Sequence, residues 1–340
     1  MKVTLDEANK MTVPKKIYHG IENVFCGRRE ISLQRLCKEY ASDVFGSEVF
    51  WPWLYLYSGV SGGFKNGWLP GGYFHSFVSP RINGDYGKIA SLTGLPKVLF
   101  DGSKFPDVLY FVNGVFLDLD RNVVKESSVY EFLYQDADTV WFKSDNSSEG
   151  RGVWSIKREN FDLDNVRNRG NGAFQQDIQQ HSVLSGLCSS AVATIRLVTV
   201  YSKGRAECEV RAGYLRVARI NENHVSSRTQ ISIPIDLNTG QLESKGWFHD
   251  YGSSEVHPDS GVRFRDVRIP SFRQCVEEVV SLHATIPFVG LVGWDVTIDR
   301  DEEMRIIEWN AESPSVTFIE ATQGPCFSDL NWQSFAKARV

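Results

Sequence analysis

The sequence predicts an α+β fold, in which helices and antiparallel hairpins follow one another along the chain. Apolar residues recur at helical spacing in residues 32–45 and again in residues 271–284. The pattern is strand-like from residue 97 to residue 119. An apolar run at 97–100 predicts one short strand, and residues 108–117 predict two more around Asn113 and Gly114, a residue pair that type I′ hairpin turns favour. Because helices alternate with such hairpins, we expect α+β architecture rather than an all-helical or all-strand fold.

A second predicted hairpin, residues 293–310, carries a candidate metal site. Glu308 and Asn310 are two residues apart, so on a strand they point to the same face, and their neighbours are apolar. Asp295, on the preceding strand, lies close to both if the hairpin closes around the acidic turn. Three such oxygen donors suit Mg²⁺, which prefers oxygen ligands and shares them with phosphates. An acidic strand end that faces water is the alternative interpretation of this segment.

Residues 140–153 contain a candidate phosphate-binding loop. An apolar strand ends at Lys143, and the polar loop that follows contains Gly150 and Gly152. Glycine allows positive φ, so successive N–H groups can face an anion. The loop is not a Walker A sequence, and no strand–GxGxxG–helix unit is present. An ordinary glycine-containing hairpin loop is the alternative.

The loop and the hairpin, in this order, resemble the ATP-grasp superfamily. The resemblance is strongest to the branch associated with sugar transfer and with capsular or exopolysaccharide synthesis. It covers about residues 80–325 and implies two α+β subdomains that clasp a nucleotide. Further segments between the two elements match in the same order: residues 175–181, 193–199, 215–219, 233–240 and 257–261.

The resemblance implies a nucleotide site with ATP as its ligand. Lys143 corresponds to the lysine that contacts the phosphates, and Lys97 is the best match to a second, earlier lysine, with Lys88 and Lys104 as alternatives. The hinge has Gln176 and Asp177 where a glutamate is common, which puts the ribose contact in doubt. The other expected nucleotide-binding residues lie in the covering loop and the hinge: Ser147, Ser148, Gly150, Gly152, Gln176, Asp177, Ile178 and Gln180.

The resemblance also implies the metal ligands and the catalytic cations. Asp295, Glu308 and Asn310 correspond to the residues that bind Mg²⁺. Arg196 and Arg216 are expected to act with Lys143 as catalytic residues, because a planar guanidinium suits carboxylate and phosphoryl oxygens. Arg211 and Arg219 are weaker candidates, and residues 221–229 lack a glycine pair often found there.

Composition is that of a globular protein and excludes several classes. The 340 residues are 42% apolar and 23% charged, and the net charge of −5 gives no footprint for nucleic-acid binding. Six cysteines without CxxC spacing argue against a zinc cluster and for reduced thiols. No apolar run suits a secretory signal or a transmembrane helix, so we expect a cytoplasmic protein.

Three regions are expected along the chain. Residues 1–80 form a helical, aromatic-rich region whose first thirty residues are polar and expected to be partly irregular; residues 81–325 form the ATP-grasp body; residues 326–340 form a tail. Ten aromatic residues lie between positions 49 and 77. They are expected to pack this region onto the body, although stacking on sugars or contact with a membrane surface is the alternative.

The expected function is that of an ATP- and Mg²⁺-dependent carboxylate–amine ligase acting through an acyl phosphate. By the resemblance, its carboxylate is linked to a sugar, and contact with other enzymes of polysaccharide synthesis is expected. Two alternatives stay open: a phosphotransferase acting on a sugar hydroxyl, and a non-catalytic module that binds a saccharide or a partner protein.

Overall fold

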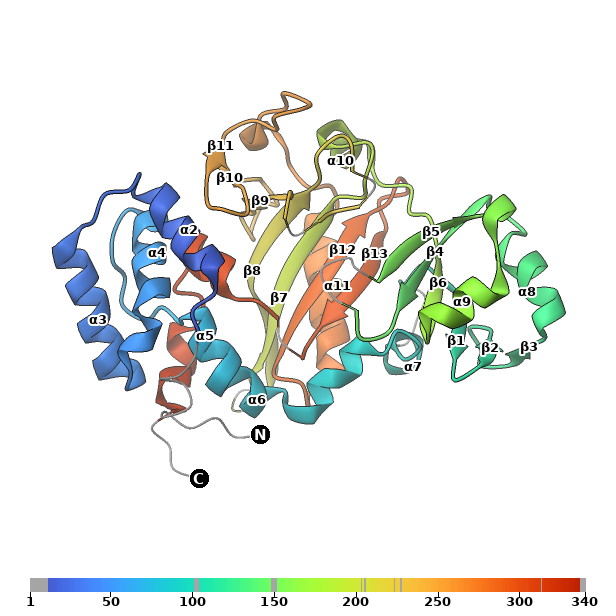
Figure 1. Cartoon of the computed structure of the whole chain (residues 1–340), viewed down its shortest axis with the longest axis horizontal. Helices are drawn as coiled ribbons and strands as arrows, with labels where there is room; N and C mark the ends of the chain where they lie inside the picture. The colour runs from blue at the N-terminus through green and yellow to red at the C-terminus, as the bar shows by residue number, and fades with distance from the viewer. Residues whose placement is uncertain are drawn as a thin grey trace.

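The computed structural model describes residues 12–100, 104–147 and 152–336, apart from the single positions 203, 205, 223, 227 and 313. It has three parts in a row (Figure 1). Helices from the N-terminal part lie at one end, a seven-stranded sheet lies in the middle, and a six-stranded sheet lies at the other end. Helices combined with antiparallel sheets confirm the α+β expectation.

The N-terminal part is helical and holds a large aromatic core. Its helices are α2 (Lys15–Val24), α3 (Ile31–Phe45), α4 (Trp51–Ser61), α5 (Gly71–Tyr73) and α6 (Ser79–Ile82). Among the described residues of the first thirty, helix α2 is the regular part, and residues 25–30 after it are irregular. The helix forms because Ile17, Ile21 and Val24 follow helical spacing and pack toward α4, where a Cβ at Gly59 would lie 2.5 Å from Val24.

The aromatic residues between positions 49 and 77 pack the N-terminal part onto the body, as expected. Trp53, Trp68 and Tyr73 share one buried cluster with Val198 and Leu291 of the central sheet. Helix α12 (Thr317–Thr322) joins the same cluster. The segment expected to be a tail also takes part from residue 326 to 336, through residues such as Phe327 and Trp332.

The central sheet is antiparallel throughout. One of its faces packs on helices, and the other carries charged residues. Its strand order is β11-β10-β9-β8-β7-β12-β13. The strands are β7 (Thr194–Ser202), β8 (Glu207–Val217), β9 (Ile231–Pro234), β10 (Gly246–Trp247), β11 (Ser253–Ser254), β12 (Leu291–Ile298) and β13 (Met304–Asn310). One face packs on α11 (Phe272–Ala284) and α10 (Ser182–Leu187) through residues such as Leu197 and Trp294. The other face carries Arg196 and Asp295, because successive side chains alternate between the faces.

The six-stranded sheet has the order β3-β2-β1-β6-β4-β5. Its strands are β1 (Asp107–Val112), β2 (Val115–Leu117), β3 (Val123–Val124), β4 (Thr139–Ser144), β5 (Val153–Lys157) and β6 (Gly172–Gln176). Asn113 and Gly114, with φ of 50° and 84°, form the predicted tight turn between β1 and β2. Phe142 and Phe174 on one face join a cluster with α8 (Glu126–Leu133) and α9 (Leu163–Arg169).

One local expectation is wrong. Residues 97–100 were expected to be a strand, but α7 (Pro96–Leu99) is a short helix. Pro96 stands at its first position, where proline lacks only an N–H that would be unpaired anyway.

Two further findings concern the cysteines and membrane insertion. All six cysteines lie among the described residues, and each is a free thiol. In the part of the chain that the structure describes, no helix combines the length and the apolar character needed to cross a bilayer.

Candidate active site

A cleft lies between the two sheets, and residues of both sheets line it. Its larger chamber has a volume of about 450 Å³ and extends from the end of β6 to strands β7, β8 and β13. A smaller chamber of about 200 Å³ continues it toward residues 90–96. The two chambers share six lining residues from both walls: Lys143, Ser147, Gln175, Ile307, Glu308 and Asn310.

The register of the central sheet brings the predicted metal and catalytic residues onto one wall. Asp295 on β12 lies directly opposite Glu308 on β13 and Arg196 on β7. Directly opposed residues point to the same face, as do residues two apart. Arg196 faces Tyr214 on β8, and Arg216 lies two residues further along the same strand. All four charged side chains therefore face the cleft, and each lines the larger chamber.

Asp295 is held between two arginines. Arg196 donates from Nε and Nη2 to its two carboxylate oxygens, with 2.7 Å from Nη2 to Oδ2. Arg216 adds its Nη2 at 2.5 Å from the same Oδ2. Burial acts to lower the pKa of Arg196, but the charge of Asp295 outweighs it and raises that pKa. The result is a buried cluster of two cations and one anion on the floor of the cleft.

Lys143 reaches across the cleft from β4 to the central sheet. Its Nζ lies 2.7 Å from Glu308 Oε2 and donates to the carbonyl oxygen of Ile307 at 3.1 Å. Asn310 Nδ2 donates to Glu308 Oε1 at 3.1 Å. Burial acts to raise the pKa of Glu308, but Lys143 outweighs it and holds the pKa well below its usual range. Glu308 is therefore ionised at neutral pH.

The wall formed by the six-stranded sheet carries further polar residues, and sequence reasoning missed Asp107, Tyr110 and Trp141 among them. Asp107 accepts hydrogen bonds from Gln175 Nε2 at 2.8 Å and from the Tyr110 hydroxyl at 2.9 Å, and burial raises its pKa. Trp141 Nε1 donates to Asp177 Oδ1 at 3.1 Å. Strand pairing sets Asp107, Gln175 and Trp141 side by side. The available signal was the position of Asp107 directly before an apolar strand.

The hinge residues divide into two groups. Gln176, Asp177 and Ile178 line the larger chamber. Gln180 is not among the lining residues. Its Nε2 donates to the carbonyl oxygens of Cys188 and Ala191, and its Oε1 accepts from the Ala193 N–H at 2.8 Å. In the structure, Gln180 therefore stabilises the segment that connects β6 to β7 and does not line the chamber.

The covering loop is described only at its two ends. Ser147 lines both chambers and donates to the Ser144 carbonyl oxygen at 2.8 Å. A Cβ at Gly152 would lie 2.2 Å from the Ser147 Cβ, so the close approach of the loop ends requires glycine there. Ser148 and Gly150 lie outside the described residues.

None of the three lysines considered for the earlier nucleotide contact lines either chamber. Lys97 Nζ lies 3.8 Å from Asp120 Oδ1, and Lys104 Nζ lies 2.8 Å from Glu303 Oε2. Lys88 makes an exposed ion pair with a carboxylate three residues before it. The charge of Lys97 still acts on the cleft, since it opposes the rise in the pKa of Asp107.

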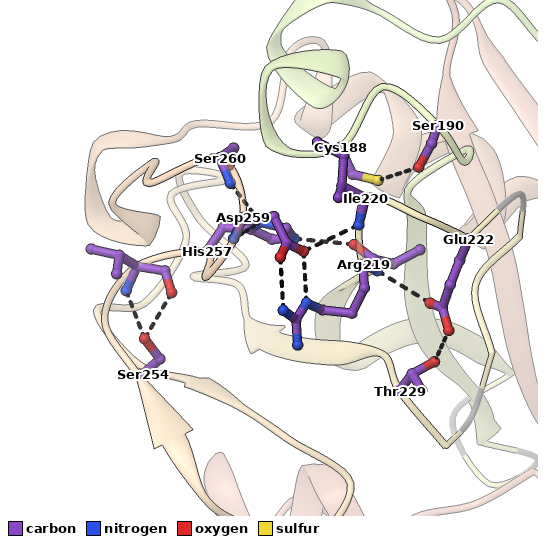
Figure 2. A network of polar contacts seen from close by, with 12 residues as sticks. Cys188, Ser190, Arg219, Ile220, Glu222, Thr229, Ser254, His257, Asp259 and Ser260 are labelled. Atoms are coloured by element: carbon purple, nitrogen blue, oxygen red, sulfur yellow. Dashed lines mark hydrogen bonds and ion pairs between the residues drawn. The ribbon is translucent and has the colours of Figure 1, made fainter.

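A polar network fixes the chain where it leaves β8 (Figure 2). Arg219 donates to both carboxylate oxygens of Asp259, at 2.6 and 2.7 Å, and holds the pKa of Asp259 at about 2. The buried His257 lies with Nε2 3.1 Å from the Ala218 carbonyl oxygen. Arg219, one of the weaker candidates for the site, therefore belongs to this network; we call its ion pair with Asp259 the clamp. The loop that follows Arg219 returns to the cleft at His224, Val225 and Gln230.

The family model described as sugar-transfer associated ATP-grasp matches residues 130–331. The chain belongs to this family. The matched range contains the whole charged wall of the cleft as well as Lys143, and the resemblance expected from the sequence is confirmed. Among curated proteins, none matches this chain significantly.

Solved structures of ATP-grasp enzymes are similar in fold. The biotin carboxylase domain of 2-oxoglutarate carboxylase from Hydrogenobacter thermophilus is 11% identical, with a TM-score of 0.44 over 74% of this chain and 46% of that chain. The ATP-grasp ligase PsnB with its minimal precursor is 10% identical, with a TM-score of 0.41 over 76% and 64%. The D-alanine–D-alanine ligase from Coxiella burnetii is 9% identical, with 0.38 over 73% and 57%. The chain spans about half the length of the biotin carboxylases that it matches.

The residues of this ATP-grasp cleft fit Mg²⁺ unequally. Glu308 is ionised and lies beside Asn310, so the pair can offer the hard oxygen donors that Mg²⁺ prefers once Lys143 Nζ and Asn310 Nδ2 turn away from the Glu308 oxygens. Asp295 is held more firmly, because two guanidinium groups contact its buried carboxylate, and it reaches a cation only after one of them releases it. Within the described segments, no group of three or more His, Cys, Asp or Glu residues is arranged to hold a metal.

Proposed function

We propose that this protein is an ATP- and Mg²⁺-dependent carboxylate–amine ligase that acts through an acyl phosphate. ATP and Mg²⁺ are the cofactors that ATP-grasp membership implies. We further propose that the carboxylate belongs to a sugar, and that the product enters surface polysaccharide synthesis with other enzymes of that process as partners. The description of the family as sugar-transfer associated supports this finer assignment.

One observation carries the proposal: three cations converge on the same cleft from two different sheets. Lys143 comes from β4, Arg196 from β7 and Arg216 from β8. Their side chains are 12%, 8% and 17% exposed, so they act in surroundings that weaken charge far less than water does. A reaction that gathers negative charge, such as phosphoryl transfer to a carboxylate, is favoured by cations placed in this way.

The proposed reaction has two steps. A carboxylate oxygen attacks the γ-phosphorus of ATP, which forms the acyl phosphate and releases ADP. The amine then attacks the carbonyl carbon; the C–N bond forms, the C–O bond to the phosphate breaks, inorganic phosphate leaves, and the nitrogen loses a proton to solvent.

The chain's own residues orient these groups and neutralise their charge. Lys143 is placed to neutralise the transferred phosphoryl group, and the fork of Arg216 is placed to hold carboxylate and phosphoryl oxygens. Glu308 and Asn310 would hold Mg²⁺, which supplies further charge neutralisation when bound. We assign this site to residues 81–325, between the N-terminal region 1–80 and the C-terminal segment 326–340.

Hydroxylamine trapping tests the proposal, because hydroxylamine converts an acyl phosphate into a stable hydroxamate. The protein is incubated with ATP, Mg²⁺ and hydroxylamine, together with glucuronate, galacturonate or another uronic acid. We expect hydroxamate and ADP to form in equal amounts with at least one acid, and neither to form when EDTA is present. A phosphate ester of the sugar in place of the hydroxamate would show a phosphotransferase instead.

A further inference from the structure

Two residues that line the larger chamber each have a buried polar atom without a hydrogen-bond partner among the described residues. These atoms are Oε1 of Gln230 and Nε of Arg216. A buried polar atom without a partner destabilises a protein, and nearly all such atoms are paired. Because this pair lies in the wall of the cleft rather than in the packed core, a bound molecule is the natural source of the missing partners.

Strand pairing sets these two residues on the same wall. Gln230 directly precedes β9, and Ser232 on β9 lies opposite Arg216 on β8. Gln230 is two residues before Ser232, so the three side chains point to the same face. Gln230 Nε2 donates to Ser232 Oγ at 3.2 Å, and Oε1 of the same amide is the acceptor that has no partner among the described residues.

The loop before Gln230 is fixed from outside the cleft (Figure 2). Thr229 Oγ1 donates to Glu222 Oε1, and the Arg219 N–H donates to Glu222 Oε2 at 3.2 Å. The ion pair of Arg219 with Asp259 holds the start of the same loop. These contacts fix the chain on the N-terminal side of Gln230 and, with the bond to Ser232, limit the positions that its amide can take.

One of the two unpaired atoms is a hydrogen-bond donor and the other is an acceptor, so each suits a different group of a bound substrate. Arg216 Nε is a donor and suits an oxygen of the carboxylate or acyl phosphate. Gln230 Oε1 is an acceptor and suits an N–H group. A primary amine can donate one hydrogen to Oε1 and still direct its lone pair at the carbonyl carbon. A neutral amide does not stabilise the ammonium form, whereas a carboxylate here would favour it and so remove the lone pair.

We propose that Gln230 Oε1 accepts a hydrogen bond from the attacking amine, and that Gln230 therefore selects a primary amine as the second substrate. The proposal rests on the ligase function argued above. It assigns to the segment before β9 a specificity role that the motifs alone do not give.

Binding measurements test the assignment without any turnover. Glucosamine, L-alanine, L-serine and L-lysine are titrated singly into the protein saturated with MgADP, using wild type, Gln230→Leu and Gln230→Glu. The matched control is Gln274→Leu, on the exposed surface of α11, where Gln274 contacts Glu278. We expect at least one amine to bind about fivefold to tenfold more weakly to Gln230→Leu than to wild type, since one hydrogen bond is lost. Binding to the control should match wild type within about twofold. Gln230→Glu, which keeps an acceptor oxygen and favours the ammonium form, should bind the amine at least as tightly as wild type.

The pH dependence of turnover adds a measurement that a purely structural role would not change. In Gln230→Glu the new carboxylate stabilises the ammonium form of the bound amine, which raises its pKa. The acid side of the pH–rate profile for amide formation should therefore move to higher pH. Hydroxamate formation at saturating hydroxylamine should stay the same in the control Gln274→Leu, which lies on the exposed surface of α11.

The outcomes separate this inference from the ligase function. Wild-type protein that forms no hydroxamate with any acid would contradict the ligase function. Hydroxamate formation together with equal amine affinities in wild type and Gln230→Leu would overturn the role of Gln230 alone. No amine binding to wild type, or an equal loss of MgADP affinity in Gln230→Leu, would also overturn it; a measurable MgADP affinity in each variant shows that the protein is folded.

Discussion

Asp295 shows how strongly the chemistry of this cleft depends on single ion pairs. Its side chain is 2% exposed, and Arg196 and Arg216 together provide its charge partners. A buried carboxylate without such partners would be expensive to maintain. The cluster therefore stabilises the fold and at the same time holds two guanidinium groups at the cleft.

Replacing Arg196 by methionine should destabilise the protein. Asp295 then keeps Arg216 but loses the two hydrogen bonds from Arg196, and the free energy of unfolding should fall by roughly 3 kcal/mol. Urea denaturation measures the change. Arg273→Met is the control, because its pair with Glu277 on α11 is exposed, and its effect should stay below about 0.5 kcal/mol. Equal midpoints for the two variants would contradict the importance of the buried pair.

Replacing Glu308 by alanine should abolish ATP-dependent product formation while the protein stays folded. The change removes the oxygen donor proposed for Mg²⁺ and the carboxylate partner of Lys143, so hydroxamate formation should fall by about 100-fold or more. Asp301→Ala, in the turn of the same hairpin, should keep wild-type activity. Wild-type activity in Glu308→Ala would remove this residue from the metal site.

At the scale of elements, the residues that one hairpin brings together could be predicted from local pattern. Contacts between segments far apart in the sequence could not. The period of two predicts that Glu308 and Asn310 share a face of the hairpin of β12 and β13. The pairing of Asp295 with Glu308 also depends on a β-bulge between Asp295 and Val296, because the turn alone would set Asp295 opposite Ile307. The contact of Lys143 with Glu308 joins residues 165 positions apart, and no local pattern encodes the meeting of the two sheets. The sequence resemblance placed Lys143 and Glu308 in one nucleotide site without predicting their contact, and it left Asp107 and Gln230 out.

Local pattern also misplaced the segment around Lys97. Its apolar residues suit a strand as well as a helix, and Pro96 decides for a short helix. The side chain of Lys97 consequently points to Asp120 rather than into the cleft. Short apolar runs of this kind are decided by their flanking residues and by tertiary packing.

Loss of the clamp between Arg219 and Asp259 should weaken binding of the amine substrate. Asp259→Asn should weaken amine binding about threefold to tenfold and leave MgADP binding unchanged, because the loop that it holds lines the cleft at residues 224, 225 and 230. Arg219→Gln should have the same effect, and the double variant should be no worse than either single one. Additive losses in binding would show that the two residues act separately.

The pH dependence of this pair has a definite sign. The pKa of Asp259 is lowered from its ordinary value to about 2, so the pair contributes stability above about pH 4. That contribution disappears as the pH falls toward 2. The stability difference between wild type and Asp259→Asn, measured by urea denaturation, should therefore be constant from pH 7 to pH 5 and shrink below pH 4. Since Arg219 is 42% exposed, the difference itself should be below about 1 kcal/mol.

At the scale of the whole molecule, one face of the central sheet serves two purposes along its strands. Val198, Val200 and Ala212 bury this face in the aromatic core of the N-terminal part. Arg196 and Arg216, further along the same strands, face the cleft. The N-terminal helices therefore fix the half of the sheet that lies away from the cleft, and the proposed nucleotide site is expected to depend on their packing.

Glu320 joins the N-terminal part to the C-terminal segment and should make the stability of the whole molecule depend on pH. It is fully buried on α12 and accepts hydrogen bonds from the N–H groups of Leu69 at 2.6 Å and Cys326 at 2.7 Å. Burial raises its pKa to about 8, above the value of an exposed glutamate, although both hydrogen bonds act to lower it.

A carboxyl group whose pKa is higher in the folded state stabilises that state most at low pH. Its contribution is fully present below about pH 4.5 and is lost as the pH rises through 8, because the buried group must then ionise. Glu320→Gln cannot ionise, although its amide faces two N–H donors and lowers stability at every pH. The stability advantage of wild type over Glu320→Gln, measured by urea denaturation at pH 5, 7 and 8.5, should therefore narrow steadily with rising pH. Glu277→Gln, on the exposed face of α11, should show no such trend. An advantage that stays constant or grows between pH 5 and 8.5 would mean that Glu320 is already ionised at pH 5 and that its two backbone donors outweigh its burial.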